Sequence, residues 1–222
     1  AIINIRHFRY MNEIFGREQA NGILKAIARI LKQNIHESER YCRYMADEFY
    51  ILLNTDDQVQ ARERVMAIMN QVGTLSENMN RTYPITLYGG IAVNPVTLPK
   101  NADDVSAGKA AETLIHRGEF ALKHARMGQD NTVVFYDESI YQAENLQNQI
   151  ESDMKRALSE GEFKLYLQPK KKLNTGKIQA AEALVRWIRN DGTMIYPDQF
   201  IPIFEKNGFC AELDLYMVEL VC

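Results

Sequence analysis

The sequence has few cysteines and no long apolar run. Cys42, Cys210 and Cys222 are the three cysteines in 222 residues, and their wide spacing matches neither a disulfide framework nor a zinc site. No apolar stretch approaches the roughly 18 residues of a membrane span, and the first residues lack the basic and apolar regions of a signal peptide. We therefore expect reduced thiols and a cytoplasmic location.

A strong positive charge is also absent. Lysine and arginine total 26 against 29 aspartates and glutamates, which gives a net charge of −3. This balance excludes the strongly basic surface that is typical of nucleic-acid-binding proteins. Hydrophobic residues make up 46% of the chain, which is an ordinary share for a globular protein of this length with a buried core.

The common catalytic signatures are missing as well. The chain has no GxGxxG, P-loop, GxSxG, HExxH or CxxC motif. The four histidines never stand four residues apart, so no histidine metal site is expected; they are His7, His36, His116 and His124. Any catalytic or ligand-binding site must therefore be sought in patterns other than these common motifs.

The first 136 residues alternate between strand and helix patterns. Strands are predicted at residues 2–5, 41–44, 49–53, 84–93 and 131–136, and helices at 19–35, after the capping pair Asp56-Asp57, and at 104–126. The first of these helices has apolar residues at helical spacing, namely Ile23, Leu24, Ile27, Ile30 and Leu31. Pro95, Pro99 and Asn101 indicate a loop. The pattern predicts an α/β or α+β domain over residues 1–136.

A second domain is predicted from residue 162. Residues 137–161 form a polar stretch with a helical apolar stripe, which predicts a linker helix that ends at Gly161. Strands at 163–168 and 178–187 follow, joined by a turn at 174–176, and Pro197 begins a helix that ends at Asn207-Gly208. The chain opens on a strand and closes on a helix pattern without a stop signal, so we expect a fragment of a longer protein.

Two groups of polar residues stand out within these domains. The first combines Asn4–Glu13, interpreted as the polar end of a strand, with the turn Arg43–Phe49. An acidic turn near a polar strand end can hold a divalent metal and a triphosphate. The alternative is a solvated hairpin turn, which the spacing alone favours.

At these residues the chain resembles the GGDEF domain, the diguanylate cyclase family of bacterial signalling proteins. Asp47-Glu48-Phe49 stands at the acidic end of the family's name-giving hairpin. Further matches are Phe8, Asn12, Phe15-Gly16, Leu87–Ala92, Ala121-Leu122 and Ala125-Arg126. The resemblance covers residues 1–136 and implies a central, mostly antiparallel sheet flanked by helices.

Several positions depart from what an active cyclase uses. The resemblance places Asn4 where the family has a metal-binding aspartate, so Asp47 alone keeps a metal-type carboxylate. Met45 and Ala46 replace the two glycines that let backbone groups approach phosphates. His36 and Glu39 replace the product-inhibition motif. The degenerate nucleotide site then comprises Asn4, Asn12, Asn21, Met45, Ala46, Asp47 and Glu48. We expect no cyclase activity, and a regulatory role for this domain.

The second group lies in Leu165–Pro169 and Ala181–Trp187. Glu182 stands among apolar neighbours, and a buried glutamate needs a partner or a metal. An outward-facing glutamate on an edge strand is equally compatible with the pattern. Lys170–Lys172 can attract phosphates or stay solvated.

Here the chain resembles the EAL domain, the cyclic di-GMP phosphodiesterase family. Glu182-Ala183-Leu184 is the name-giving triplet, and Gln168-Pro169 and Pro197–Pro202 match its flanks. The resemblance implies the first strands and helices of a TIM-type barrel, with Glu182 as a ligand of Mg²⁺ or Mn²⁺ and with Gln168, Leu184 and Arg186 as substrate contacts. Residues 162–222 are far fewer than the about 250 residues of a complete barrel, so this chain by itself is not expected to hydrolyse cyclic di-GMP.

Three hypotheses follow for the whole protein. It is a phosphodiesterase with an inert GGDEF domain, or a non-catalytic cyclic di-GMP receptor or scaffold, or a protein whose degenerate domain keeps GTP as an allosteric input. The resemblance implies a homodimer formed through either domain. Any sensor or membrane segment would precede Ala1, and we expect this chain to be the cytoplasmic portion of the protein, whether or not that protein is tethered to a membrane.

Overall fold

The computed structural model describes residues 1–75, 84–93, 103–128 and 131–222. The chain divides into two compact units, Ala1–Glu138 and Ser139–Cys222. The sequence-based division at 136 and 161 remains a prediction. The predicted loop with Pro95, Pro99 and Asn101 lies outside the described residues.

The first unit is built on a five-stranded sheet in the order β2-β3-β1-β4-β5. Its strands are β1 (Ile2–Ile5), β2 (Arg40–Arg43), β3 (Glu48–Leu52), β4 (Leu87–Ile91) and β5 (Val133–Phe135). Strand β1 pairs antiparallel with both β3 and β4, β2 pairs antiparallel with β3, and β4 pairs parallel with β5. The predicted mostly antiparallel sheet is confirmed.

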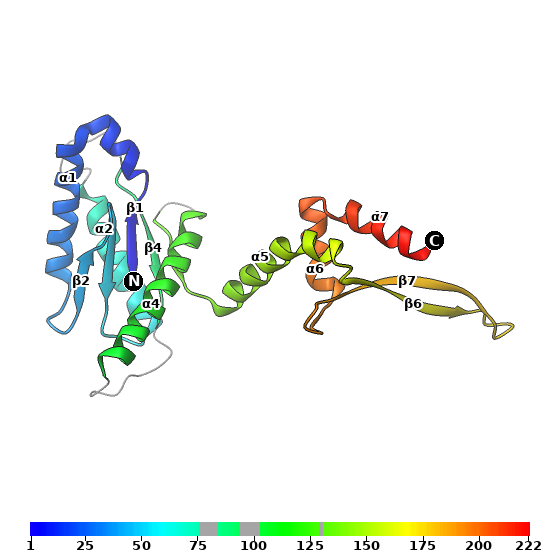
Figure 1. Ribbon diagram of the computed structural model, residues 1–222. Helices are drawn as coiled ribbons and strands as arrows, with labels where there is room; N and C mark the ends of the chain where they lie inside the picture. Colours follow the sequence, from blue (N-terminus) through cyan, green and yellow to red (C-terminus); the bar gives the residue numbers. More distant parts are fainter. Residues whose placement is uncertain (76–83, 94–102, 129–130) are drawn as a thin grey trace. The chain divides into compact units, whose positions relative to one another are not determined.

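Helices cover both faces of this sheet (Figure 1). The elements α1 (Phe8–Asn34) and α2 (Gln58–Gly73) pack on one face and form the main core with Ile3, Ile5 and Phe49. Helix α4 (Asp104–Arg126) packs on the other face against Ile2 and Tyr88. The Asp57 carboxylate caps α2 by accepting from the backbone N–H groups of Val59 and Gln60, as the sequence predicts.

Glycine sets how closely α4 approaches the sheet. A Cβ atom at Gly90 would lie 2.4 Å from the Gly118 carbonyl oxygen and 2.4 Å from the Leu122 backbone nitrogen. Any side chain at Gly90 would therefore push α4 off β4. The close packing fixes the position of Arg126 at the end of α4, which matters for the site below.

Helix α1 differs from its prediction at its start. The segment Asn4–Glu13 is not a strand end throughout, because β1 ends at Ile5 and the helix begins at Phe8 rather than near Gln19. Phe8 and Met11 are buried one helical turn apart, a spacing visible in the sequence. Gly16 interrupts the helix with φ 78° and ψ 159°.

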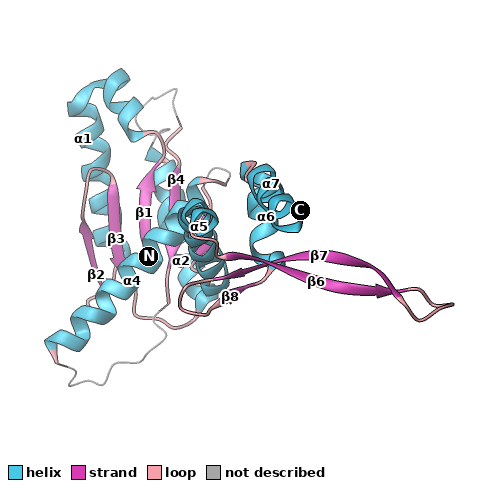
Figure 2. Cartoon of the chain, turned by 45° about the vertical axis from the view of Figure 1, so that its right-hand side comes forward, coloured by secondary structure: helices cyan, strands magenta, loops and turns pink. Residues whose placement is uncertain are grey.

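The second unit contains a three-stranded antiparallel sheet, β6-β7-β8, and three helices. The elements are α5 (Glu138–Ser159), β6 (Phe163–Lys171), β7 (Ile178–Ile188), β8 (Met194–Ile195), α6 (Pro197–Asn207) and α7 (Cys210–Val221). Figure 2 shows β6 and β7 as one long two-stranded ribbon. The two-residue strand β8 is not among the predicted elements.

An aromatic core holds the base of this ribbon. Phe163 and Trp187 pack with the α6 residues Phe200 and Phe204, and all four are fully buried. The carboxylate of Glu162 is also buried, and it accepts hydrogen bonds from Trp187 Nε1 at 2.8 Å and from Arg156 Nη1 at 2.9 Å. The core therefore fixes β6 and β7 at their paired ends Phe163 and Trp187.

Candidate functional site

The acidic turn between β2 and β3 is held by side chains from β1 and α4. Asn4 is 8% exposed, and its Nδ2 donates to Asp47 Oδ2 at 2.7 Å. Arg126 Nη2 donates to Glu48 Oε1 at 2.6 Å, and its Nε lies 3.3 Å from Asn4 Oδ1. We call Asn4, Asp47, Glu48 and Arg126 the acidic-turn network. The register pairs Asn4 with Glu48 across β1 and β3, which explains their proximity.

The backbone of the turn has one unusual residue. Ala46 adopts φ 41°, in the left-handed region that non-glycine residues rarely enter. Its carbonyl oxygen accepts from Arg43 Nε at 2.6 Å, and the Met45 carbonyl accepts from the Glu48 N–H at 2.7 Å. Met45 points into solvent and does not line the adjacent pocket. Met45 and Ala46, which the resemblance places at the family's two glycines, thus lie in a turn closed by hydrogen bonds.

The donor set of the turn does not fit a divalent ion. Burial raises the pKa of the Asp47 carboxyl above its ordinary value, and the neighbouring Glu48 raises it further while Arg126 lowers it. Asn4 presents its amide N–H to Asp47, whereas hard cations need oxygen ligands. No group of three or more histidines, cysteines, aspartates or glutamates with the geometry for a metal occurs in the part of the chain that the structure describes.

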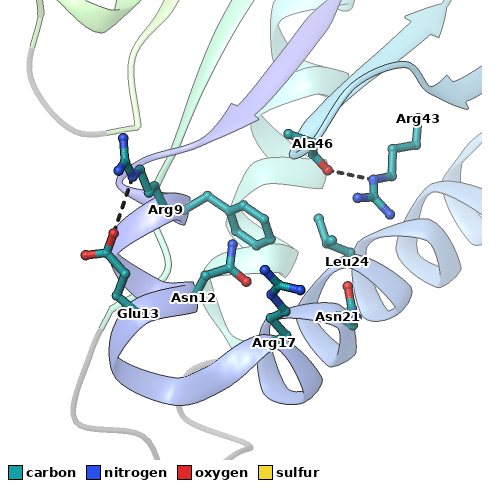
Figure 3. A pocket seen from close by; sticks show the side chains of 9 residues that line it. Arg9, Asn12, Glu13, Arg17, Asn21, Leu24, Arg43 and Ala46 are labelled. Carbon is teal, nitrogen blue, oxygen red and sulfur yellow. Dashed lines mark hydrogen bonds and ion pairs between the residues drawn. The ribbon is translucent and has the colours of Figure 1, made fainter.

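A pocket of about 460 Å³ lies beside this turn. It brings together Asn12 and Asn21 of α1 with Ala46 of the turn, three of the predicted nucleotide-site residues. Figure 3 shows the guanidinium groups of Arg17 and Arg43 at this pocket, whereas Arg9 turns toward Glu13. The Arg9 Nε lies 3.3 Å from Glu13 Oε1. The pocket therefore carries more positive than negative charge.

The predicted residues of the second unit share one face of the β6–β7 ribbon. Gln168 stands directly opposite Glu182, and Leu184 stands opposite Tyr166. Arg186 follows Leu184 by two residues, so its side chain leaves the strand on the same face. Its guanidinium lies 5.9 Å from the Tyr166 ring centre. The structure thus brings Gln168, Glu182, Leu184 and Arg186 to a single surface.

Glu182 has a basic neighbour on this face. Its Oε2 lies 2.9 Å from Lys170 Nζ, and both side chains are about half exposed or more. A lone carboxylate paired with lysine does not make a metal site, because Mg²⁺ and Ca²⁺ take several oxygen ligands. In the part of the chain that the structure describes, Glu182 belongs to no group of three or more histidines, cysteines, aspartates or glutamates that could hold a metal ion.

Among the described residues, none of the helices is both long and apolar enough for a membrane crossing.

Comparison with known protein families decides what these two units are. Residues 1–132 match the model described as "Diguanylate cyclase, GGDEF domain". The chain belongs to the GGDEF family. Residues 151–222 match the model of the EAL domain, so both resemblances predicted from the sequence are confirmed. EAL domains in general depend on divalent metal ions.

Curated relatives share this GGDEF–EAL arrangement over nearly the whole chain. Cyclic di-GMP phosphodiesterase NbdA of Pseudomonas aeruginosa is 24% identical over 99% of the chain and 27% of its own length. The bifunctional diguanylate cyclase/cyclic di-GMP phosphodiesterase MucR of the same species is 23% identical, with 97% and 30% covered. The chain therefore spans less than a third of the length of these relatives.

A solved structure supports the GGDEF fold. The GGDEF domain of DgcB from Caulobacter crescentus, in complex with c-di-GMP, aligns with a TM-score of 0.50 and 18% identity. The alignment covers 61% of this chain and 75% of that one. At this identity the likeness concerns the fold.

The sequence does not reveal the contacts that four basic residues make at these sites. Arg126 was noted only as part of the closing helix, and its contact with Asn4 spans 122 positions. Arg17 and Arg43 were not assigned to the pocket, and Lys170 was not paired with Glu182. The alternation of β6 and β7 was a usable signal for Lys170, because residues 168 and 170 share a face.

Proposed function

We propose that the full-length protein acts in cyclic di-GMP signalling, with an EAL portion that hydrolyses the dinucleotide and a GGDEF portion that does not cyclise GTP. One observation carries the proposal. Gln168, Glu182, Leu184 and Arg186 lie on one face of the β6–β7 ribbon, and these are the residues expected to hold substrate and metal.

Each of these side chains suits a distinct part of a cyclic dinucleotide. The Arg186 guanidinium presents a charged fork that matches a phosphodiester. The Gln168 amide offers both a donor and an acceptor, and Leu184 offers an apolar surface for a base. Glu182 contributes one oxygen ligand toward Mg²⁺ or Mn²⁺ in the complete domain; when bound, such ions lower the pKa of water and neutralise phosphate charge.

The GGDEF portion is proposed to be regulatory. Asn4 lacks the charge of a metal-binding carboxylate, and the acidic-turn network engages Asp47 and Glu48 with side chains of the chain itself. Without a metal beside the triphosphate, the charge that develops during phosphoryl transfer is not stabilised. We expect no cyclic di-GMP synthesis from GTP.

Hydrolysis of cyclic di-GMP by the full-length protein tests the proposal. We expect turnover with Mg²⁺ or Mn²⁺, and its loss in Glu182→Gln, which removes the charge and keeps the shape. Glu205→Gln is a matched control, because Glu205 is an exposed carboxylate on α6. Absence of turnover in the unsubstituted protein would overturn the proposal.

A receptor without turnover is the second candidate. The ion pair between Lys170 and Glu182 favours it, because the lysine engages the one carboxylate that a metal would use. This role predicts saturable binding of labelled cyclic di-GMP with no product. Lys170→Gln separates the two roles. The substitution frees Glu182 for a metal ion, but a receptor without turnover stays as inactive as before.

Nucleotide input through the first unit is a further part of the proposal. The pocket places Asn12 and Asn21 near Arg17 and Arg43, and guanidinium groups bind phosphates well. Titration of GTP, with Arg17→Gln as the comparison, tests this input. Sedimentation tests the predicted homodimer, and fractionation of cells tests the predicted cytoplasmic location.

A further inference from the structure

The two carboxylates of the acidic turn both receive hydrogen bonds from side chains of the same unit. Asp47 accepts from the Asn4 amide at 2.7 Å, and Glu48 accepts from the Arg126 guanidinium at 2.6 Å. The same guanidinium also reaches the Asn4 oxygen at 3.3 Å. Asn4 is thereby held between a donor and an acceptor, so its amide orientation is set by both neighbours.

Electrostatics explains why the turn needs such a partner. Asp47 and Glu48 are adjacent, half-buried and both acidic, and neighbouring carboxylates in partly dry surroundings repel each other. A bound cation relieves this repulsion in many proteins. Here one carboxylate meets a permanent positive charge, because arginine does not lose its proton in proteins. The other meets a neutral amide donor.

The fold holds Arg126 in place from a distant part of the sequence. Arg126 is the last residue of α4, where a positive charge is favoured by the helix dipole. Helix α4 lies against β4 so closely that Gly90 has no room for a Cβ atom. The guanidinium therefore projects from a rigid support.

We propose that Arg126 is a built-in cation that, with the Asn4 amide, makes the acidic turn independent of divalent metal. The turn then keeps its shape, and Ala46 keeps its place at the wall of the pocket, without Mg²⁺ or Mn²⁺. The inference concerns the first unit alone and does not rest on hydrolysis by the EAL portion.

Binding of Mn²⁺ to the complete chain, followed by electron paramagnetic resonance at constant ionic strength, tests the inference. In the unsubstituted chain we expect no saturable Mn²⁺ binding that depends on Asp47. The binding curve should therefore be the same in Asp47→Asn. Asn4→Asp combined with Arg126→Gln places a third carboxylate at the turn and removes the cation. We expect this double variant to gain saturable Mn²⁺ binding at the turn.

Thermal unfolding of the single variant Asn4→Asp provides a second readout. Asn4→Asp should lower the melting temperature of the first unit in EDTA, and added Mn²⁺ should raise it again. The unsubstituted chain and Arg29→Gln, which changes an exposed arginine elsewhere on α1, should show no such metal response. If the double variant does not fold, Arg126→Gln alone should show a gain in Mn²⁺ binding.

Two results would overturn the inference. One is Mn²⁺ binding by the unsubstituted chain that depends on Asp47. The other is a folded double variant, or a folded Arg126→Gln variant, that gains no Mn²⁺ binding. Neither result bears on cyclic di-GMP hydrolysis. If the turn binds Mn²⁺ and the protein still does not cyclise GTP, the inference fails while the proposed lack of cyclase activity holds.

Discussion

The acidic turn of the first unit and the β6–β7 ribbon of the second both carry carboxylates on antiparallel strand pairs, but in different surroundings. Asp47 and Glu48 are half-buried and contact Asn4 and Arg126, which come from other elements. Glu182 is exposed and contacts Lys170 on the neighbouring strand of its own ribbon. The first pair is tied into the fold, whereas the second carboxylate is free to exchange its partner.

Two further carboxylates extend the contrast. Glu39 has a side chain that is 1% exposed and forms an ion pair with Arg64, and Glu162 is equally enclosed in the second unit. A buried carboxylate with several partners supports the fold, because removal of one partner leaves a charge without solvent. An exposed carboxylate with one flexible partner contributes little to stability and remains available to a ligand. The degree of burial of each carboxylate thus predicts how strongly a substitution there, or at its partner, lowers stability.

The largest effect is expected for Arg64→Gln. It leaves the buried Glu39 without its ion-pair partner, which costs roughly 3–5 kcal/mol. Hydrogen exchange of α2 amides measures the loss in the first unit. The midpoint of Trp187 fluorescence, which reports on the second core, should not change. An unaltered exchange rate in α2 would mean that this ion pair does not stabilise the unit.

Acid should weaken the first unit through the same residue. The Arg64 guanidinium, helped by the backbone N–H groups of Asn54 and His36, holds the pKa of Glu39 at about 2 against an ordinary 4.5, although burial opposes the shift. The stabilisation is complete above pH 4.5 and is lost as the pH falls toward 2. We expect the stability difference between the unsubstituted chain and Glu39→Gln to shrink over that range. A difference that stays constant with pH would contradict the assignment.

Glu162→Gln is expected to have an intermediate effect. Burial raises the pKa of Glu162, but the Trp187 and Arg156 hydrogen bonds outweigh it and the pKa is lowered, so the group is charged at neutral pH. The amide can still accept from Trp187, but it faces Arg156 without a charge. The expected loss is about 1–3 kcal/mol, measured by Trp187 fluorescence in urea. A loss as large as that of Arg64→Gln would remove the distinction between the two cores.

The smallest effect is expected for Glu182→Gln. An exposed pair such as Lys170 and Glu182 contributes less than about 1 kcal/mol, so the Trp187 unfolding midpoint should barely move. The same substitution should abolish hydrolysis in the full-length protein. A large loss of stability would place Glu182 with the structural carboxylates and weaken its proposed role at a metal.

Local sequence patterns predicted most of the fold. The α1 stripe of Ile23, Leu24 and Ile27 is buried as expected, Asp57 caps α2, and the predicted helix at 104–126 has the bounds of α4. These signals lie within one or two helical turns. The start of α1 at Phe8 was missed because polar residues surround Phe8 and Met11, and β8 was missed because two residues carry too little pattern.

The chemistry of the sites depends on contacts between distant residues, which the sequence alone does not reveal. Arg126 and Asn4 meet only because α4 packs on β4, and Arg64 and Glu39 meet only because α2 packs beside α1. The β6–β7 face was easier to anticipate, because strand alternation already places Gln168 with Lys170 and Glu182 with Leu184. The site roles of these residues stay predictions.

The interruption of α1 at Gly16 has a stereochemical consequence. Its dihedral angles lie in a region essentially reserved for glycine. Apart from its two chain neighbours and the nearby backbone of its own helix, no described heavy atom lies within 4 Å of where its Cβ would stand. Handedness, rather than space, is therefore the constraint. L-alanine would have to abandon the bend in the stretch between Asn12 and Arg17, which both line the pocket. D-alanine, whose mirror-image backbone preferences favour a positive φ, should adopt the Gly16 φ more readily than L-alanine.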